Sequence, residues 1–433
     1  MNMKKLLCVA LALSTAVIPT VAEASEGSAD SGEKIIIWAA TTDVKDIMDN
    51  YFAKEYPDVP YEIQLYSGND YMQKLDAVLA SDSAEHPDII SAEVSYGKRY
   101  ISTVNATTSL YNIGIDEEEL SVLTPAVIDF MRDENGEPMG VSWQVTPGGL
   151  FYRRSIAEKY FGVKTPEEFQ KLVCDWDTFT ETAQKLKELS GNEVKMIATC
   201  DDFLNPFLNG SRTQSWVVDD QLVIDDAVDE LMNMTKEFYD NGYTQETAHW
   251  STGWYQTLVE DKTLCYLLPT WGLNYQLEPN CTAADGTTSY GDWGIVQPPV
   301  PYTWGGTWLL NTSKDDTKSE NIAKIMRYII SEEFQVAYAQ DTGDFVSNIT
   351  AQQKVSETCS SEFLNGQNHY EVFAAVAASV NPEIQSEYDG TIQGFLQNAA
   401  LTPYMQGELE KDEAIDAFKD EVSLYYGSDI MVD

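Results

Sequence analysis

Basic side chains are few in this chain of 433 residues. It carries 27 Lys and Arg against 70 Asp and Glu, which gives a formal net charge of -43 at neutral pH. Proteins that bind nucleic acid neutralise phosphates with a basic patch, and this chain has too few cations to assemble one. The composition therefore argues against nucleic acid as a partner, while the strong negative charge favours a soluble monomer.

Histidine is also scarce, with three residues far apart in the chain: His86, His249 and His369. None belongs to an H-E-x-x-H motif or another metal-ligand spacing, so each is expected to be a surface or hydrogen-bonded polar residue. The sequence contains no Walker loop, no G-x-S-x-G elbow and no D-x-[DN]-x-[DN]-G calcium loop. It therefore predicts a protein without a metal ion or other cofactor.

Long apolar runs are absent after the N-terminal segment, where no stretch approaches about 18 uninterrupted apolar residues, so no membrane-spanning helix is expected. Residues 1–24 have the pattern of a secretory signal peptide. Lys4 and Lys5 precede an apolar run at Leu6–Ile18, and an A-x-A cleavage site closes the segment. Residues 25–33 are small, polar and acidic, as in a flexible linker. We expect a secreted protein, periplasmic or held at the cell surface.

Cysteine is sparse as well. Cys8 lies inside the apolar run and far from the cleavage point, so the chain lacks a lipoprotein signal at that site. Five cysteines remain in the mature chain: Cys174, Cys200, Cys265, Cys281 and Cys359. An odd number outside the cell leaves at least one free thiol, and no C-x-x-C pair indicates zinc or redox chemistry. Most are interpreted as small buried hydrophobes, and Cys265–Cys281 is the favoured bridge.

Aromatic residues are plentiful at 11%, with 15 Phe, 10 Trp and 24 Tyr, which is more than a core of this size needs. Several tryptophans stand next to turn residues: Trp143, Trp250, Trp254, Trp271, Trp304 and Trp308. A ring at the rim of a sheet offers a flat apolar face to a sugar, while nearby polar side chains bond its hydroxyls. These rings are candidates for a ligand surface, whereas Trp38 and Trp176 lie inside regular elements and are expected in the core.

The N-terminal part of the mature chain alternates strands and helices. Short apolar runs predict strands at Ile35–Trp38, Tyr61–Tyr66 and Asp88–Ser91, and helical spacing predicts helices at Asp43–Tyr56 and Asp70–Ala80. This order is typical of a parallel, doubly wound α/β sheet, which binds ligands beyond the carboxyl ends of its strands. The loops at that edge are Ala39–Asp43, Ser67–Asp70 and Ala92–Tyr96.

The rest of the chain mixes both kinds of element without an internal repeat. Strands are expected at Gly140–Val145, Gly149–Tyr152, Val194–Thr199, Leu264–Leu268, Asp292–Val296 and Thr307–Asn311. Helices are expected at Pro166–Val173, Trp176–Leu189, Asp225–Tyr239 and Glu320–Ile330, with four more before Tyr426.

Short segments spread over the whole mature chain carry a family resemblance. They are Ile35–Trp38, Tyr71–Leu75, Pro87–Ile90, Gly140–Trp143, Phe151–Arg154, Trp176–Phe179, Leu268–Gly272 and Gly305–Trp308. In order and spacing they resemble extracellular solute-binding proteins of family 1, the carbohydrate receptors of ABC importers, similar to maltose- and oligosaccharide-binding proteins. The resemblance implies a two-lobed, type II periplasmic-binding-protein-like fold with a doubly wound sheet in each lobe and a ligand cleft between them. By that pattern residues 34–128 and 306–350 form lobe 1, and residues 129–305 and 351–433 form lobe 2.

The same resemblance places the ligand contacts. Together with the turn-flanking tryptophans, it gives this candidate set: Glu93, Trp143, Asp201, Asp202, Phe203, Trp271, Trp304, Gly306 and Tyr388. One departure concerns Ser91 and Ala92, which stand where maltose-type receptors carry an aromatic residue. The departure argues against maltose itself as the ligand.

The resemblance implies that the protein binds a solute and catalyses no reaction. A sugar or oligosaccharide would close the two lobes, and the membrane permease of an ABC importer would recognise the closed form. Two alternatives stay open: a receptor for a polyamine-like cation, because acids and rings also bind cations, and a secreted glycoside hydrolase, which needs two placed carboxylates. A structural surface protein is less favoured because the chain lacks repeats.

Overall fold

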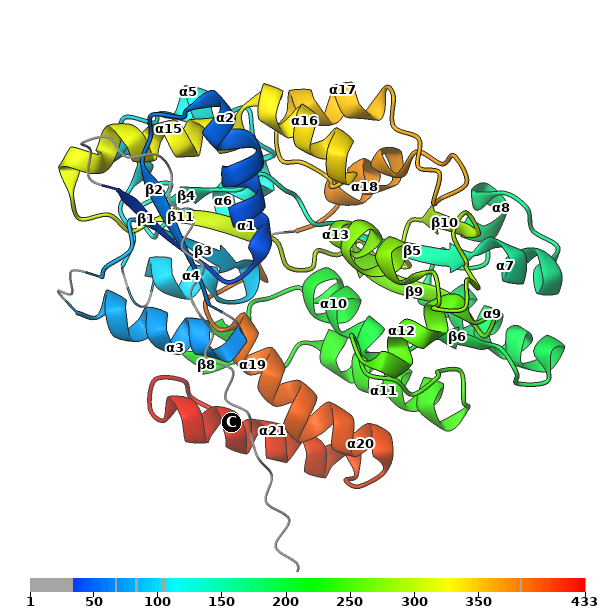
Figure 1. Ribbon diagram of the computed structural model, residues 1–433. Coiled ribbons are helices and arrows are strands. Elements are labelled where there is room, and N and C mark those ends of the chain that lie inside the picture. The colour runs from blue at the N-terminus through cyan, green and yellow to red at the C-terminus, as the bar shows by residue number, and fades with distance from the viewer. Residues whose placement is uncertain are drawn as a thin grey trace, which may run out of the picture.

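The computed structural model describes residues 34–66, 68–81, 85–102, 104, 106–381 and 384–432. The predicted signal peptide 1–24 and linker 25–33 lie outside these residues. The described chain forms two lobes, each built around its own sheet, as predicted (Figure 1). Within that part of the chain, no helix combines the length and apolar character needed to span a membrane.

The first lobe contains a five-stranded sheet in the order β2-β1-β3-β11-β4. Its strands are β1 (Ile35–Ala39), β2 (Tyr61–Leu65), β3 (Ile89–Glu93), β4 (Gly140–Val141) and β11 (Thr307–Asn311). β1 pairs in parallel with β2 and β3, which confirms the predicted β-α-β-α-β order. β11 lies antiparallel between β3 and β4. Since β4 belongs to this sheet, the chain first leaves lobe 1 after Val141 and not at residue 129 as the predicted boundary has it.

Helices cover both faces of this sheet because successive strand residues point to opposite sides. On one face Ile37, Ile89 and Leu309 pack with Val44 of α1 and Ile325 of α15. On the other, Trp38, Ile90 and Trp308 pack with residues of α3, α4 and α6. The helices of this lobe are α1 (Thr42–Ile47), η1 (Met48–Phe52), α2 (Ala53–Glu55), α3 (Gly68–Leu79), α4 (Val94–Ser102), η2 (Leu110–Ile113), α5 (Glu117–Leu120), α6 (Pro125–Phe130), η6 (Asp316–Lys318) and α15 (Ser319–Ile330).

The second lobe contains a four-stranded sheet in the order β10-β5-β9-β6. Its strands are β5 (Gly148–Arg153), β6 (Lys195–Ile197), β9 (Thr263–Pro269) and β10 (Trp293–Val296). β5 runs antiparallel to both β10 and β9, and only β6 and β9 are parallel. The sheet of this lobe is therefore mixed and not wholly parallel. The reason lies in the chain path: β5 enters from the first lobe at Gly148, opposite Pro269, where β9 leads back to the cleft.

Many helices surround the second sheet, and the C-terminal segment belongs to this lobe because Phe418 and Val422 join its core. They are α7 (Arg154–Phe161), α8 (Pro166–Gln170), α9 (Trp176–Ser190), η3 (Cys200–Phe203), α10 (Leu204–Pro206), η4 (Phe207–Ser211), α11 (Asp226–Asp240), α12 (Thr252–Val259), α13 (Thr270–Gly272), η5 (Leu273–Leu277), α14 (Glu278–Asn280), α19 (Asp389–Phe395), η8 (Leu396–Leu401), α20 (Thr402–Gln406) and α21 (Lys411–Tyr426). A small hairpin, β7 (Val217–Val218) and β8 (Gln221–Leu222), completes it.

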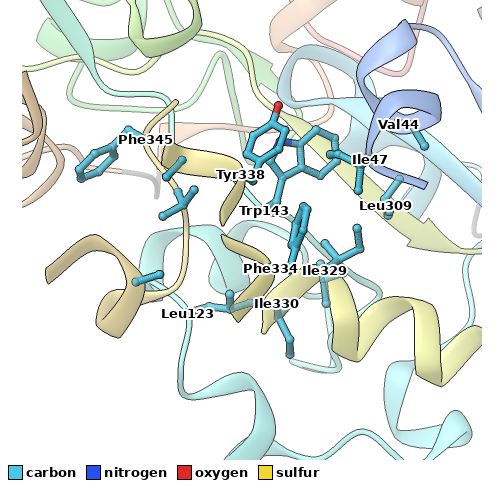
Figure 2. Close-up of a cluster of buried hydrophobic side chains, with 14 of the residues drawn as sticks. Val44, Ile47, Leu123, Trp143, Leu309, Ile329, Ile330, Phe334, Tyr338 and Phe345 are labelled. Atoms are coloured by element: carbon cyan, nitrogen blue, oxygen red, sulfur yellow. The ribbon is translucent and has the colours of Figure 1, made fainter. Parts of the chain in front are cut away.

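Three helices lie between the lobes in Figure 1: α16 (Glu332–Thr342), α17 (Ile349–Ser356) and α18 (His369–Ala377). They contribute to one hydrophobic core that includes residues of both sheets. Trp143 sits in this core beside Phe334 and Tyr338, with no exposed surface (Figure 2). Its prediction as a ligand contact is wrong, because the helices after β11 cover the ring completely.

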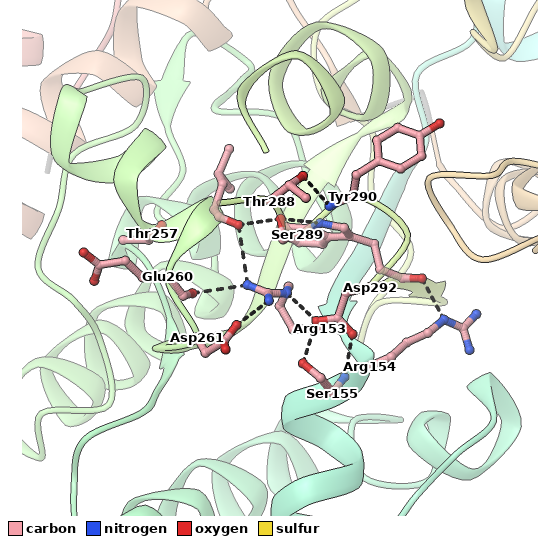
Figure 3. Close-up of polar contacts among 12 residues, drawn as sticks. Arg153, Arg154, Ser155, Thr257, Glu260, Asp261, Thr288, Ser289, Tyr290 and Asp292 are labelled. Atoms are coloured by element: carbon pink, nitrogen blue, oxygen red, sulfur yellow. Dashed lines mark hydrogen bonds and ion pairs between the residues drawn. The ribbon is translucent and has the colours of Figure 1, made fainter. Parts of the chain in front are cut away.

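A polar network fixes the outer end of β5. The guanidinium of Arg153, 3% exposed, bonds Asp292 (Nε to Oδ2, 2.8 Å) and Asp261 (Nη2 to Oδ1, 2.5 Å), as Figure 3 shows. Asp292 also accepts hydrogen bonds from the backbone N–H and hydroxyl of Ser155. A buried cation is stable only when paired and hydrogen-bonded in this way. The network therefore anchors the second sheet and leaves the cleft to other residues.

Candidate functional site

The cleft between the lobes contains a cavity of about 420 Å³, which we call the aromatic compartment. Its lining residues are Thr41, Thr42, Asp43, Glu93, Gln144, Trp250, Trp271, Tyr275, Gln276, Trp304, Gly305, Gly306 and Thr307. Asp43 follows β1 and Glu93 ends β3, so the carboxyl edge of the first sheet forms one wall. Trp271 in α13 and Tyr275 in η5 extend from the second lobe and form the other. Both lobes therefore contribute to one cavity, as ligand-driven closure requires.

A second cavity of about 390 Å³, the amide compartment, adjoins the first. Glu93, Trp304 and Gly305 line both, so they mark the junction. Its other polar lining residues are Ser95, Asp201, Asn205, Asn209, His249, Gln385, Asp389, Gln393 and Gln397. Amide and carboxylate groups in this number can bond several hydroxyls of one ligand.

Three tryptophans form a platform in the aromatic compartment. The ring centroids of Trp250, Trp271 and Trp304 lie 5.6–5.9 Å apart pairwise, and all three rings are half-buried. The indole N–H of Trp271 donates to the backbone oxygen of Trp304 over 3.4 Å. Trp250 has φ 63°, in the left-handed region that a bulky residue adopts at a cost. The strained backbone holds this ring toward the cleft.

The chain crosses between the lobes directly after Trp304. Gly305 and Gly306 have φ of 69° and 111°, a conformation that suits glycine. A Cβ at Gly306 would lie 3.2 Å from the Thr146 hydroxyl oxygen, so a larger residue would also crowd the opposite strand connection. The predicted positions Trp304 and Gly306 therefore meet at the cleft, where they remain candidates for ligand contact.

A histidine supports the tryptophan platform from behind. The His249 ring stacks on Trp250, with centroids 5.0 Å apart, and its Nε2 lies 2.7 Å from Oδ1 of Asp202. Asp202 is only 1% exposed, and burial raises its pKa, while its bond to His249 opposes that rise. The prediction of Asp202 as a ligand contact is therefore wrong: its carboxylate is turned to the histidine and lines neither compartment.

The other candidates from the sequence divide into two groups. Glu93, Asp201 and Trp271 line the compartments, and Gln397 donates a hydrogen bond of 3.2 Å to Asp201. Phe203 is completely buried, edge-on to Phe238 in the second core, so its prediction as a contact is wrong.

Contact of Tyr388 with the ligand stays a prediction. The ring of this half-buried residue packs against Tyr426 of α21, with centroids 5.7 Å apart, and lines neither compartment. The neighbouring Asp389 lines the amide compartment in its place.

Two acids, one in the wall of the aromatic compartment and one buried next to it, are not among the site residues predicted from the sequence. Asp43 accepts hydrogen bonds from the backbone N–H of Val44 and the hydroxyl of Thr41, and burial raises its pKa. Asp344 is completely buried, and burial raises its pKa to about 7. The side-chain amide of Gln144 donates to it over 3.1 Å and thereby connects it to the compartment.

The sequence does carry a signal for two site residues outside the candidate set. Asp43 ends the loop Ala39–Asp43, which the predicted strand order places at the ligand-binding edge of the sheet, and Trp250 is one of the turn-flanking tryptophans. Of the other marked loops, Ala92–Tyr96 begins at the end of β3 and continues as α4. In Ser67–Asp70, Ser67 lies outside the described residues and Gly68 begins α3. Asp344 carried no local signal, because it meets Gln144 across 200 positions of sequence.

The family model of bacterial extracellular solute-binding proteins matches residues 48–362. The chain belongs to this family. The match covers most of both lobes and confirms the resemblance drawn from the short segments. The family is one of extracellular binding proteins, in keeping with a ligand cavity to which both lobes contribute.

Solved structures are similar to this solute-binding protein over nearly its whole length. An extracellular solute-binding protein of family 1 has 19% identity and a TM-score of 0.76, with 90% of this chain and 99% of that chain covered. An ABC transporter associated binding protein from B. animalis subsp. lactis, in complex with beta-1,6-galactobiose, has 16% identity and a TM-score of 0.70, with 93% and 100% covered.

The galacto-N-biose/lacto-N-biose I-binding protein of a Bifidobacterium longum ABC transporter, in complex with lacto-N-biose, has 15% identity and a TM-score of 0.70, with 94% and 100% covered. At these identities the likeness establishes the fold, a two-lobed type II periplasmic-binding-protein-like architecture.

Proposed function

We propose that this solute-binding protein captures a sugar or oligosaccharide in its cleft and delivers it to the membrane permease of an ABC importer. The observation that carries the proposal is the platform of Trp250, Trp271 and Trp304 facing carboxylate and amide groups. Flat rings cover the C–H face of a sugar, while polar side chains bond its hydroxyls. The similar proteins with bound disaccharides support the same class of ligand.

The two compartments favour a ligand of more than one ring. Cavities of about 300–1,000 Å³ hold small organic ligands, and here about 420 Å³ and 390 Å³ adjoin at Trp304. We infer that one sugar stacks in the aromatic compartment and the next reaches the amide compartment. A ligand that contacts Asp43 and Glu93 from one lobe and Trp271 from the other favours the closed form by its differential affinity.

No step in this proposal makes or breaks a covalent bond. The protein acts as a monomeric receptor outside the cell, and the permease reads the closed arrangement of the lobes. A glycoside hydrolase would need two carboxylates on either side of a glycosidic bond, with one of them near the leaving oxygen. The platform supports binding of a sugar without requiring such a pair.

The test is a thermal-shift screen against mono- and oligosaccharides, followed by calorimetry on those that stabilise the protein. A bound ligand raises stability by RT ln(1 + [L]/Kd), so a true ligand gives a concentration-dependent rise in melting temperature. Stoichiometric binding without product, and loss of binding in Trp271→Ala, would support the proposal. Repeated turnover of a bound oligosaccharide, or no response to any sugar, would overturn it.

A further inference from the structure

Two carboxylates approach the same part of the aromatic compartment. Asp43 follows β1 and Glu93 ends β3, and because β1 and β3 are parallel neighbours, both acids lie at one edge of the sheet. Thr307 stands between them. It pairs in register with Glu93, and its hydroxyl donates to Oδ2 of Asp43 over 3.5 Å. A ligand group that enters here meets both acids.

Glu93 has no partner of its own. Its carboxylate makes no hydrogen bond or ion pair with any residue that the structure describes, although it lines both compartments. Burial raises its pKa, and the negative charge of Asp43 raises it further. An enclosed carboxylate ordinarily has a donor or a cation beside it, because the charged form is costly otherwise. Glu93 is half-buried and faces the cavity, so a ligand that displaces water from the cavity has to supply such a donor or cation.

The surroundings supply little positive charge. Among the described residues that line the aromatic compartment, none is Lys or Arg. The amide compartment is lined by His249, whose ring nitrogen Nε2 already hydrogen-bonds to the carboxylate of Asp202. A further hollow of about 570 Å³ adjoins Asp43 and is lined by Asp46, Asp341 and Lys54. Acids thus outnumber cations along the whole cleft.

The aromatic platform is compatible with a cationic ligand. The faces of tryptophan rings attract cations as well as the C–H face of a sugar. Gln276 and Thr42 line the same compartment and offer hydrogen bonds to hydroxyls. A linear polyamine would satisfy the acids but would not use the hydroxyl-binding groups. A neutral sugar would use those groups and would donate a hydroxyl to Glu93, but it would leave the negative charges of Asp43 and Glu93 without a cation between them.

We propose that the solute is an amino sugar, with its protonated amine between Asp43 and Glu93 and its ring against the tryptophans. The inference rests on the proposed sugar-binding function and adds the charge of the ligand to it. Charge-assisted hydrogen bonds from an ammonium to two enclosed carboxylates are among the stronger polar contacts in proteins. Acetylation of the amine would remove the charge while it preserves the sugar ring.

Isothermal calorimetry on the mature protein tests this directly. The probes are glucosamine, galactosamine and the β-1,4-linked glucosamine disaccharide, each beside its N-acetylated form, at a pH of about 6 where such an amine is protonated. We expect at least one amine to bind about tenfold or more tightly than its N-acetylated counterpart. Spermidine serves as the cation without a sugar ring.

Two variants assign the preference to a residue. Glu93→Gln keeps the size of the side chain and removes its charge, so it should lower the affinity for the amine much more than the affinity for the N-acetylated sugar, and most of the preference for the amine should be lost. Glu230→Gln on the exposed side of α11 makes the same change in net charge away from the cleft, and it should keep the preference. Melting curves of both variants confirm that they fold.

The outcomes separate this inference from the proposed function. If neutral or N-acetylated sugars bind as tightly as the amines, or if Glu93→Gln lowers the affinity for both forms equally, the amino sugar inference is overturned while sugar binding stands. If spermidine binds and no sugar does, both proposals are overturned. If none of the amines binds, the inference is overturned as well.

Discussion

Gly390 of α19 lies directly against the backbone of Ser95 in α4, so that these two residues form a contact between the lobes. A Cβ placed on Gly390 would lie 2.5 Å from the Ser95 carbonyl oxygen, closer than atoms of that kind approach one another. Both residues line the amide compartment. The absence of a side chain at position 390 therefore lets the two helices meet at the rim of the cleft.

Gly390→Ala should weaken ligand binding without unfolding the protein. The added methyl group does not fit at this contact between the lobes, so it should hinder the lobe closure that we propose and lower the affinity about tenfold, the cost of a moderate steric strain. Stability without ligand should stay the same or rise, because alanine favours a helix by about 1 kcal/mol over glycine.

Calorimetry and melting curves measure the two effects. Gly253→Ala in α12 is the matched control, since a Cβ there would lie 3.5 Å from Thr247 Cγ2 and 3.8 Å from Ser251 Oγ, both ordinary contact distances. Unchanged affinity in Gly390→Ala would show that the contact does not limit closure.

Trp271→Ala should weaken ligand binding with little loss of stability, whereas Trp143→Ala should lower the stability of the fold. Trp271 is half-buried at the cleft, so its removal should weaken sugar binding about tenfold or more and cost little stability. Trp143 is completely buried, and its removal should cost about 3–5 kcal/mol of unfolding free energy. Denaturant unfolding and calorimetry on the two variants give the comparison. A large loss of stability in Trp271→Ala with unchanged affinity would identify its ring as part of the core.

The strands of the first lobe could be predicted because local pattern determines them. Thr307–Asn311 is a short apolar run between turn residues, and it forms β11 with those bounds. The direction of β5 was not predictable in this way, because periodicity reports which face of a strand is buried and not which neighbour it pairs with. The same limit applies to the mixed second sheet as a whole.

The prediction of site residues depends on the same difference between local pattern and long-range contacts. Glu93 lies in a loop that the strand order places at the edge of the sheet, Trp271 is a turn-flanking tryptophan, and the family resemblance makes both of them candidate contacts. Trp143 stands in a similar place, but Phe334 and Tyr338, far along the chain, cover it. Long-range packing of this kind leaves no mark in the local sequence, and for that reason the same tryptophan pattern gave both a cleft residue and a core residue.

The mature protein should contain no disulfide. The structure leaves all five described cysteines free, which contradicts the predicted Cys265–Cys281 bridge. Cys265 lies within β9 and Cys281 follows α14, each buried in a different hydrophobic cluster. Burial raises the pKa of the Cys265 thiol and slows its reaction with thiol reagents, whereas Cys174 is exposed.

A thiol assay therefore should find Cys174 reacting rapidly in the native protein and five thiols after denaturation without a reductant. Cys174→Ser should lose the rapid phase and nothing else. Three thiols in the denatured protein would indicate a disulfide after all.

Asp344 should make stability fall as the pH rises from about 4 to 7. Its pKa is about 7 in the folded state and near 3.8 in the unfolded chain, so the unfolded state releases its proton first. Below the pKa of the unfolded state the carboxyl group is protonated in both states and costs no stability. Above the pKa of the folded state it is ionised in both states, and the folded state is destabilised by the full amount. A shift of that size corresponds to as much as about 4 kcal/mol.

Asp344→Asn removes this titration, although it disturbs the hydrogen bond from Gln144 by a constant amount at every pH. The stability of the variant relative to the natural protein should consequently improve between pH 4 and 8, by an amount that approaches the same figure of about 4 kcal/mol. Urea unfolding at a series of pH values measures the difference, with Glu230→Gln, which alters an exposed acid on α11, as the control for the change in net charge. A flat difference for Asp344→Asn would mean that water or a neighbouring group keeps Asp344 ionised at an ordinary pH, so that the carboxylate beneath Gln144 would add to the negative charge of the cleft.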